Sequence, residues 1–401
     1  MKISGKRILR RSNLLRKFTF SLVTVAITLI LVEIGLHLVT IAGWGRESLK
    51  IGDDRLQYRP NPRFPDHDQH GFRNQCVPAM ADIVALGDSQ TYGTGVAAQE
   101  AWPKQLEAAT KKSVYSMAFG GYCPVHSLIL WDEAIRLKPR IIIEGFYAGN
   151  DLFDAFNLVY NYHQHPELKT SDEQLAANIQ KAEESEPIIE RISNHASEIF
   201  TMKSEQHGFL RRYSKLYDLC WAIRFLYAQK SGTPQQQWIY AQTFATARPE
   251  RCEAFDCPPF RTVFTPGYRL CGLDLTDPRI LEGHRICLKA ISRINQLARQ
   301  QQIKFLVINI PTKELVFREI CQDALPKYRT LVRNESRMWE ISRCFFEEND
   351  IAYVDVLSAL RAQLADGLQP YPVSHDSHPN KYGHAAIVNS LESLLFDSGT
   401  D

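Results

Sequence analysis

The sequence has little net charge for its length. Its 401 residues include 47 Lys and Arg against 45 Asp and Glu, which gives a formal net charge of +2. Nucleic-acid-binding proteins usually have a clear basic excess, so this balance argues against that class and we expect no nucleic-acid partner. Hydrophobic residues make up 44% and charged residues 23% of the chain. This composition is ordinary for a globular protein and excludes disordered, collagen-like and low-complexity chains.

Several common enzyme signatures are also missing. The sequence has no glycine-rich loop with a lysine for binding phosphate groups, and no Gly-x-Ser-x-Gly segment of the usual α/β-hydrolase type. The nine cysteines and the scattered histidines lack the spacing of a zinc site, so we expect no metal and no cofactor. An odd cysteine count leaves at least one thiol without an intrachain partner, while Cys252 and Cys257 are close enough for a local disulfide.

Charge and hydrophobicity are unevenly distributed at the N-terminus. Residues 1–17 contain seven basic and no acidic side chains, and residues 18–44 are almost wholly apolar apart from Glu33 and His37. A helix of about 27 residues spans ~40 Å, more than the ~30 Å hydrocarbon core of a bilayer. We therefore expect a single-pass anchor at 18–44, with the basic tail in the cytoplasm and the rest exported. A signal peptide cleaved near Ala42 is the alternative.

Short apolar runs alternate with helical patterns after this segment. Residues 45–80 are polar and contain four prolines, which predicts a stalk and a loop leading into the fold. The runs that suit buried parallel strands lie at 83–86, 114–119, 140–146, 305–310 and 351–356. With helices between them, they predict a parallel sheet between helical layers, formed by residues 81–151 and 277–401. Residues 152–276 contain no clear strand series, so we expect a helical insertion that acts as a lid or cap.

A serine follows the first predicted strand, in the segment Gly87-Asp88-Ser89-Gln90. Open α/β sheets place their functional sites at this carboxyl edge. A serine hydroxyl is a weak nucleophile unless a base removes its proton. Taken alone, the Gly-Asp-Ser tripeptide is a common turn, and capping of a helix by Ser89 is the more frequent explanation of it.

An aspartate and a histidine, Asp376 and His378, lie on one loop before a C-terminal helix predicted to end near residue 395. Such a loop can place an imidazole over the end of the first strand, with the carboxylate fixing its tautomer. The alternative is structural, because Asp376 or Asn380 can simply cap the helix.

Glycine and asparagine follow two further strands. Run 114–119 leads into Gly120 and Gly121, and run 140–146 leads into Ala148-Gly149-Asn150-Asp151. Acyl transfer creates an oxyanion that needs fixed hydrogen-bond donors, and a glycine N–H and an asparagine amide can supply them. A tight turn at the glycines and an Asx turn at Asn150 are the alternatives.

Taken together, the four segments resemble the SGNH hydrolases, also called GDSL-like lipases and esterases. The residues that match the family's serine, glycine, asparagine and histidine are Ser89, Gly121, Asn150 and His378, with Gly121 chosen over its neighbour by distance from the strand. The resemblance implies a flavodoxin-like three-layer α/β fold of about five parallel strands. It implies Ser89 as nucleophile, His378 as general base and Asp376 as its orienting group. It also implies an oxyanion hole formed by the Ser89 and Gly121 N–H groups and the Asn150 side chain.

The sequence departs from the family pattern at two positions. Many members separate the aspartate and histidine by three residues, which would put His375 at the aspartate position, whereas the separation here is two. Ala148 stands where many members have glycine. The overall layout resembles a single-span, membrane-anchored bacterial branch, on segments 71–74 (GFRN), 145–147 (GFY) and 310–314 (IPTKE). This branch implies an inner-membrane protein with a cytoplasmic N-terminus and a periplasmic catalytic domain.

These observations favour a serine esterase that cleaves acetyl or other short acyl esters on carbohydrate or cell-envelope substrates. Two alternatives remain: an O-acyltransferase that uses the same residues to acylate a glycan, and a non-catalytic glycan-binding envelope protein. The Ser89–His378 pair argues against the last, because a binding module needs no base. The expected partners are an acyl ester, a glycan and the membrane lipid around 18–44. Lys313 and Glu314 follow a late strand and either border the cleft or form a surface ion pair.

Overall fold

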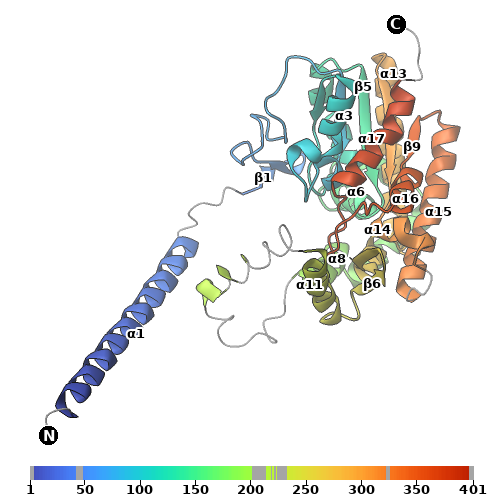
Figure 1. The fold of residues 1–401 in the computed structure, drawn as a ribbon. Coiled ribbons are helices and arrows are strands. Elements are labelled where there is room, and N and C mark those ends of the chain that lie inside the picture. The colour runs from blue at the N-terminus through green and yellow to red at the C-terminus, as the bar shows by residue number, and fades with distance from the viewer. Residues whose placement is uncertain are drawn as a thin grey trace. The chain divides into compact units, whose positions relative to one another are not determined.

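The computed structural model describes residues 4–41, 48–200, 214–217, 219–220, 223, 233–321 and 326–396. The chain divides into two compact units (Figure 1). One consists of Met1–Arg46 with Met202–Thr233, and the other of Glu47–Thr201 with Pro234–Asp401.

The first unit is built around one long apolar helix, α1 (Ser4–Ile41). Its segment Arg16–Leu38 has a mean hydropathy of 2.2 and is long and apolar enough to cross a membrane, as a membrane anchor or a signal sequence would be. The end of the expected span, residues 42–44, lies outside the described residues. Glu33 accepts hydrogen bonds from Ser214 Oγ at 2.8 Å and from the Leu216 N–H at 3.0 Å. The acidic group in the apolar helix is therefore partnered within its own unit.

Five parallel strands form the centre of the second unit. They are β3 (Ile83–Gly87), β4 (Val114–Ser116), β5 (Ile141–Tyr147), β8 (Lys304–Ile310) and β9 (Tyr353–Asp355). Hydrogen bonding places them in the order β4-β3-β5-β8-β9. Numbered along the chain, this is the flavodoxin-like order 2-1-3-4-5. The predicted strands and the predicted parallel α/β fold are confirmed.

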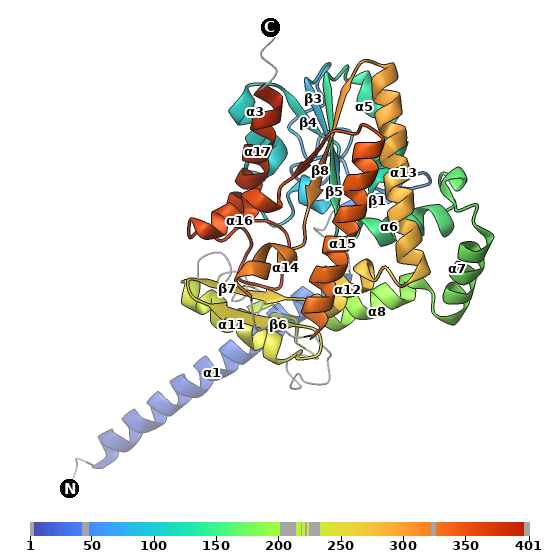
Figure 2. The ribbon, with the colours of Figure 1, turned by 90° about the vertical axis from the view of Figure 1, so that its right-hand side faces the viewer.

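Helices cover both faces of this sheet (Figure 2). One layer holds α3 (Trp102–Thr110), α16 (Leu357–Ala365) and α17 (Lys381–Phe396). The other holds α4 (Pro124–Ile129), α5 (Trp131–Arg136), α6 (Asp151–Tyr160), α13 (Pro278–Gln300) and α15 (Pro326–Glu348). Short turns of 3₁₀-helix lie at Ala98–Glu100, Pro166–Leu168 and Phe317–Glu319. Because both faces are covered, every residue of β3 and β5 is buried, which explains why both strands are apolar except for Glu144 of β5.

The insertion at 152–276 contains a β-hairpin as well as helices. Its helices include α7 (Glu173–Ser185), α8 (Ile188–Phe200), α11 (Pro234–Thr246) and α12 (Pro266–Leu273). Strands β6 (Glu253–Cys257) and β7 (Phe260–Phe264) pair antiparallel between them. The expectation of a region without strands is wrong here. The reason is that β6 is polar and largely exposed, so it lacks the apolar run that marks a buried strand.

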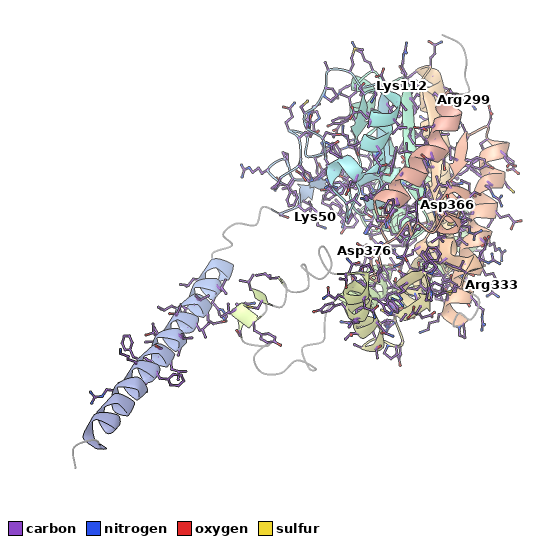
Figure 3. All side chains as sticks on the ribbon, in the orientation of Figure 1. Lys50, Lys112, Arg299, Arg333, Asp366 and Asp376 are labelled. Carbon is purple, nitrogen blue, oxygen red and sulfur yellow. The ribbon has the colours of Figure 1, made fainter. Side chains whose placement is uncertain are left out.

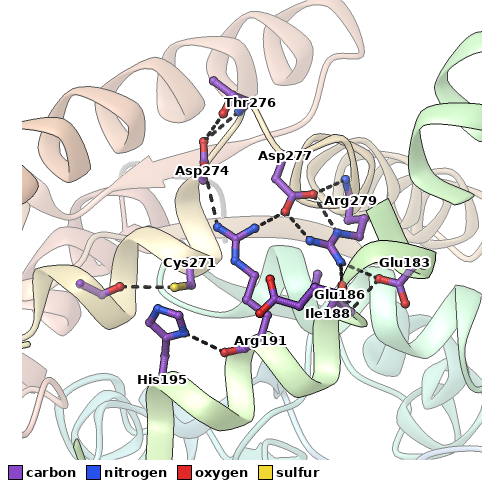
Figure 4. A network of polar contacts seen from close by, with 11 residues as sticks. Glu183, Glu186, Ile188, Arg191, His195, Cys271, Asp274, Thr276, Asp277 and Arg279 are labelled. Carbon is purple, nitrogen blue, oxygen red and sulfur yellow. Dashed lines mark hydrogen bonds and ion pairs between the residues drawn. The ribbon is translucent and has the colours of Figure 1, made fainter. Parts of the chain in front are cut away.

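An ionic network fixes α7 and α8 to the start of α13 (Figure 4). Asp277 caps α13 by accepting the Arg279 N–H at 2.9 Å, and it also binds the Arg279 guanidinium, with Nη2 at 2.7 Å. Arg279 reaches Glu183 of α7 at 3.0 Å, and Arg191 of α8 binds Asp277 as well. This part of the insertion is therefore held to the sheet domain by charged groups on both sides.

The described part of residues 45–80 packs against the sheet domain instead of standing clear of it as a stalk. Strands β1 (Lys50–Asp53) and β2 (Gln57–Pro60) form a hairpin, and Leu56 and Phe72 are buried in the main core. Arg73 donates hydrogen bonds to the carbonyl oxygens of Gly93 at 2.8 Å and Val96 at 3.0 Å. This segment is polar overall, so its composition did not reveal the few side chains that attach it to the sheet domain.

Candidate active site

Ser89 is the first residue of α2 (Ser89–Tyr92), which is separated from the end of β3 by a single residue. The preceding residue, Asp88, caps this helix, because its Oδ1 accepts the Gln90 N–H at 2.9 Å. The capping role that the sequence allowed for Ser89 therefore belongs to Asp88. The Ser89 side chain remains half-exposed at the carboxyl edge of the sheet, with its Oγ 3.3 Å from Asp88 Oδ2.

His378 reaches Ser89 from the C-terminal loop. Its Nε2 lies 2.9 Å from Ser89 Oγ, and its Nδ1 lies 2.6 Å from Asp376 Oδ1. When Nδ1 carries the proton that binds the carboxylate, Nε2 is free to accept the serine proton. The side chain of His378 is 22% exposed, so a substrate can approach it. A separation of two residues between aspartate and histidine is thus compatible with a serine–histidine–aspartate arrangement.

The charge of Asp376 is stabilised by its neighbours. Burial alone would raise the pKa of this carboxyl, but the hydrogen bond and charge of His378, together with the Lys313 cation, lower the pKa to about 2. The carboxylate therefore stays ionised at ordinary assay pH. An ionised Asp376 can orient the imidazole and stabilise the imidazolium that forms when Ser89 loses its proton.

Two glycines after β4 differ in how they face Ser89. A Cβ placed on Gly120 would lie 3.8 Å from Ser89 Cβ, whereas one on Gly121 would lie 2.3 Å from the Tyr58 hydroxyl oxygen. Tyr58 also donates a hydrogen bond to the Gly120 carbonyl at 3.1 Å. Within the described residues, the N–H groups of Ser89, Gly120 and Gly121 have no backbone acceptor. A Cβ on Gly120 would thus face the Ser89 side chain, while Gly121 stays the predicted oxyanion donor.

Asn150 precedes α6 at its N-cap position but makes no capping hydrogen bond with its side chain. Instead its Nδ2 donates to Asp154 Oδ2 at 2.7 Å. An amide nitrogen has two hydrogens, so one is oriented by Asp154 and the second remains for another acceptor. The Asx turn that the sequence allowed does not account for this residue.

Two buried cations contact the same loops: Lys313, which the sequence allowed to border the cleft, and Arg269, which sequence reasoning did not single out. Arg269 of α12 donates to Ser377 Oγ and to the Gly149 carbonyl, 3.3 Å away. Lys313 is fully buried, so the surface ion pair considered for it is wrong. The position of Lys313 after a strand end was a sequence signal for a residue near the site. Arg269 lies in the insertion and belongs to no motif, so nothing in the sequence pointed to it.

The insertion also contacts the loop that carries Asp376 and His378, through an aromatic ring. Phe244 of α11 stacks on His375, with ring centroids 4.0 Å apart and an interplanar angle of 5°. His375 is the residue that the commoner family spacing would put at the aspartate position, and it lies against Phe244 instead. Figure 3 shows Asp376 where the C-terminal loop meets the α11–β6 region. Part of the insertion thus packs against the loop that carries Asp376 and His378.

The cysteines that the sequence singled out, and the groups able to bind a metal ion, can be located within the described residues. Cys252 is buried and Cys257 exposed, and both are free thiols, so the local disulfide that their spacing allowed is not formed. Across the part of the chain that the structure describes, no group of three or more His, Cys, Asp and Glu side chains is placed to hold a metal ion.

No protein-family profile and no curated protein matches the chain. Solved structures similar to it include a GDSL-like lipase from Bacteroides thetaiotaomicron, at 9% identity and a TM-score of 0.33, covering 79% of this chain and 88% of that one. A lipolytic protein of the G-D-S-L family from Desulfitobacterium hafniense, described as putative, has 12% identity and a TM-score of 0.34, covering 78% and 98%. A mutant of the acetylxylan esterase Axe2 from Geobacillus stearothermophilus has 11% identity and a TM-score of 0.34, covering 80% and 96%. Similarity at this level establishes neither a family nor an activity.

Proposed function

We propose that this chain is a membrane-anchored serine hydrolase of the SGNH type. Its substrates are acetyl or other short acyl esters on carbohydrate or cell-envelope polymers. The observation that supports this most is the 2.9 Å contact between Ser89 Oγ and His378 Nε2, continued by the 2.6 Å contact between His378 Nδ1 and Asp376. Ser89 and His378 lie 289 positions apart in the sequence, and both reach the carboxyl edge of the sheet.

The reaction follows from this geometry in two steps. Ser89 Oγ attacks the ester carbonyl while His378 Nε2 takes the hydroxyl proton, and the tetrahedral intermediate then expels the alcohol, which His378 protonates. This leaves an acyl group on Ser89. Water, deprotonated by His378, attacks that acyl group, releases the carboxylic acid and restores the serine.

An oxyanion hole is part of the proposal. The donors are the Ser89 N–H, a glycine N–H of the segment after β4, and the Asn150 amide. Gly121, the glycine that matches the family motif, is the proposed second donor, and its φ of +79° is one that glycine adopts without strain. The bond from Asn150 to Asp154 holds the amide in one orientation, which is what a fixed donor requires.

The anchor and its orientation are likewise proposed. The apolar segment of α1 and the basic residues before it support an uncleaved helix at 18–44 in a bacterial inner membrane. The basic tail favours a cytoplasmic N-terminus and a periplasmic catalytic unit. The site would then meet esters of the cell envelope.

Replacing the nucleophile tests the proposal. We expect Ser89→Ala to lower the hydrolysis of p-nitrophenyl acetate by ~10⁴-fold or more, because the attacking oxygen is removed. A fluorophosphonate probe should label the unaltered protein at Ser89 and leave the variant unlabelled. Ser336→Ala, which removes a hydroxyl from α15 far along the chain, is the matched control and should keep full activity. Unchanged turnover in a folded Ser89→Ala variant would exclude the proposed nucleophile.

The same acyl-serine can pass its acyl group to a sugar hydroxyl in place of water. Incubating the enzyme with an acyl donor and a soluble oligosaccharide separates these outcomes. Hydrolysis predicts free acid as the main product. Acylated oligosaccharide in excess of free acid would replace the esterase proposal with an acyltransferase.

A further inference from the structure

Lys313 is a fully buried cation next to the loop that carries Asp376 and His378. It begins α14 (Lys313–Val316), shortly after β8. Its Nζ donates hydrogen bonds to three main-chain carbonyl oxygens. They belong to Val263 at 2.8 Å, Ser374 at 3.0 Å and Asp376 at 3.0 Å. An ammonium group has three N–H donors, so all of them are used.

This arrangement is unusual for a buried lysine. Removing an ammonium group from water costs free energy that a carboxylate partner commonly offsets, yet within the described residues no carboxylate oxygen is bonded to Lys313 Nζ. The ammonium group instead donates hydrogen bonds to main-chain carbonyl oxygens of two separate segments. One is β7 of the insertion, and the other is the loop at 374–376.

We propose that Lys313 is a positioning residue that fixes the loop at 374–378 against β7 and so sets the place of the His378 imidazole. The link is short, because Lys313 holds the Asp376 carbonyl while the Asp376 carboxylate holds His378 Nδ1. The effect on rate rests on the proposed function, whereas the effect on the loop does not. Since a misplacement of about 1 Å can cost ~10²-fold in rate, kcat should depend on Lys313 more than KM does.

The protonation of Lys313 follows from the groups around it. Burial is the largest influence and lowers its pKa to about 8. The titratable and charged groups that face it are Glu314, Asp376, Arg269, Cys252 and His375. Below pH 8 the ammonium group binds all three carbonyls. Above it, the neutral amine keeps two hydrogens and turns a lone pair toward a carbonyl, so the loop should loosen as pH rises through this value.

Hydrogen exchange on the full chain tests the positioning directly. We expect Lys313→Met to speed amide exchange several-fold in the peptide that contains residues 374–378, with little change in the strands of the sheet. Lys327→Met is the matched control, since Lys327 also donates to a carbonyl of the insertion, that of Glu250, but is exposed. Exchange at the unaltered rate in a folded Lys313→Met variant would overturn the proposal.

Turnover supplies the second readout. For p-nitrophenyl acetate we expect kcat to fall ~10- to 100-fold in Lys313→Met with KM nearly unchanged. Lys313→Arg, which keeps a cation at every assay pH, should recover part of kcat and lose the decline that we expect of the unaltered enzyme above pH 8. A folded Lys313→Met variant with unaltered kcat and an unaltered pH profile would contradict the inference.

Measurements on the unaltered protein cover two remaining cases. If Lys313→Met does not fold, exchange at 374–378, corrected for the intrinsic effect of pH, should be faster above pH 8 than below it. Constant protection across that range would overturn the proposal. If the unaltered protein hydrolyses no ester and takes no fluorophosphonate, the proposed function fails, while the exchange measurement still decides the role of Lys313.

Discussion

At the scale of single residues, the proposed chemistry depends on how Asp376 holds the imidazole of His378. The carboxylate accepts both the ring Nδ1–H and the His378 main-chain N–H, at 2.6 Å and 3.1 Å. Two contacts from one oxygen fix both the ring and the backbone that bears it. The neighbouring Lys313 cation then holds the main chain at Asp376 from the other side.

Replacing Asp376 with asparagine tests this role. We expect Asp376→Asn to lower kcat by ~10³- to 10⁴-fold, because an amide can donate to Nδ1 and leave the proton on Nε2, the wrong tautomer for a base. The measurement is kcat for p-nitrophenyl acetate at pH 7. A decrease of less than tenfold would show that Asp376 does not orient the ring.

The same variant has an expected effect on stability. Because the pKa of Asp376 is lowered to about 2 in the folded state, its ionised form stabilises the fold above the ordinary aspartate pKa near 4. This contribution is lost as pH falls from about 4 towards 2. Denaturant unfolding should therefore show Asp376→Asn as less stable than the unaltered protein at pH 7, with the difference shrinking in acid. A constant difference would contradict the low pKa.

Single residues also show what the sequence could and could not reveal. Ser89 and His378 were predictable because each lies in a short motif at a strand end or before a helix. Gly121 was selected by its position in the motif, and counting from a strand says nothing about the direction of its N–H group. Lys313 could be placed after β8, but its burial depends on β7, which comes from 50 positions earlier in the chain.

At the scale of elements, the insertion is attached to the sheet domain by ion pairs where α7 and α8 meet the start of α13. Asp277 is 6% exposed at its side chain and binds both Arg279 and Arg191 (Figure 4). Burial by itself would raise its pKa, but hydrogen bonds from Arg279 and the charges of both arginines lower it instead. The carboxylate therefore remains charged where two helices of the insertion meet the start of α13.

Removing that carboxylate should destabilise the fold without acting on the chemistry. We expect Asp277→Ala to lower the free energy of unfolding by about 3–5 kcal/mol, because two arginines lose a buried partner and α13 loses its cap. Asp350→Ala is the control, since Asp350 also pairs with an arginine but is 90% exposed at its side chain, and it should change stability by less than about 0.5 kcal/mol. Equal losses from both variants in denaturant unfolding would contradict the account.

The burial of each strand also explains which strands could be predicted from the sequence. The five strands were recognisable because helices cover the sheet on both sides and most of the strand residues are apolar. The β6–β7 hairpin escaped notice because β6 is polar and mostly exposed. Its contact with the catalytic loop, and the stacking of Phe244 on His375, join segments that carry no common motif. The lid or cap role expected for the insertion stays a prediction.

At the scale of the whole molecule, the apolar helix and the sheet domain belong to different compact units. The sheet, both helical layers and the residues of the proposed site all lie in Glu47–Thr201 and Pro234–Asp401. The core of that unit is continuous and includes side chains from the hairpin at 50–60 through α17. Its stability should therefore not depend on α1.

Deleting residues 1–47 tests this separation. We expect the shortened protein to leave the membrane fraction and to hydrolyse p-nitrophenyl acetate with an unchanged kcat, because that soluble ester needs no membrane. Fractionation of cells followed by an esterase assay measures both properties. Retention in the membrane would show a second attachment, and loss of activity in a folded protein would show that the N-terminal helix contributes to the site.

The central claim is that Ser89 forms an acyl-enzyme during turnover. The most direct measurement is to stop a reaction with p-nitrophenyl acetate by acid during the first turnovers and to locate the acetyl group by peptide mass spectrometry. The account predicts an acetyl group on Ser89 in the unaltered protein and none at that position in Ser89→Ala. Hydrolysis that proceeds without acetylation of Ser89, or acetylation at another residue that supports turnover, would contradict it.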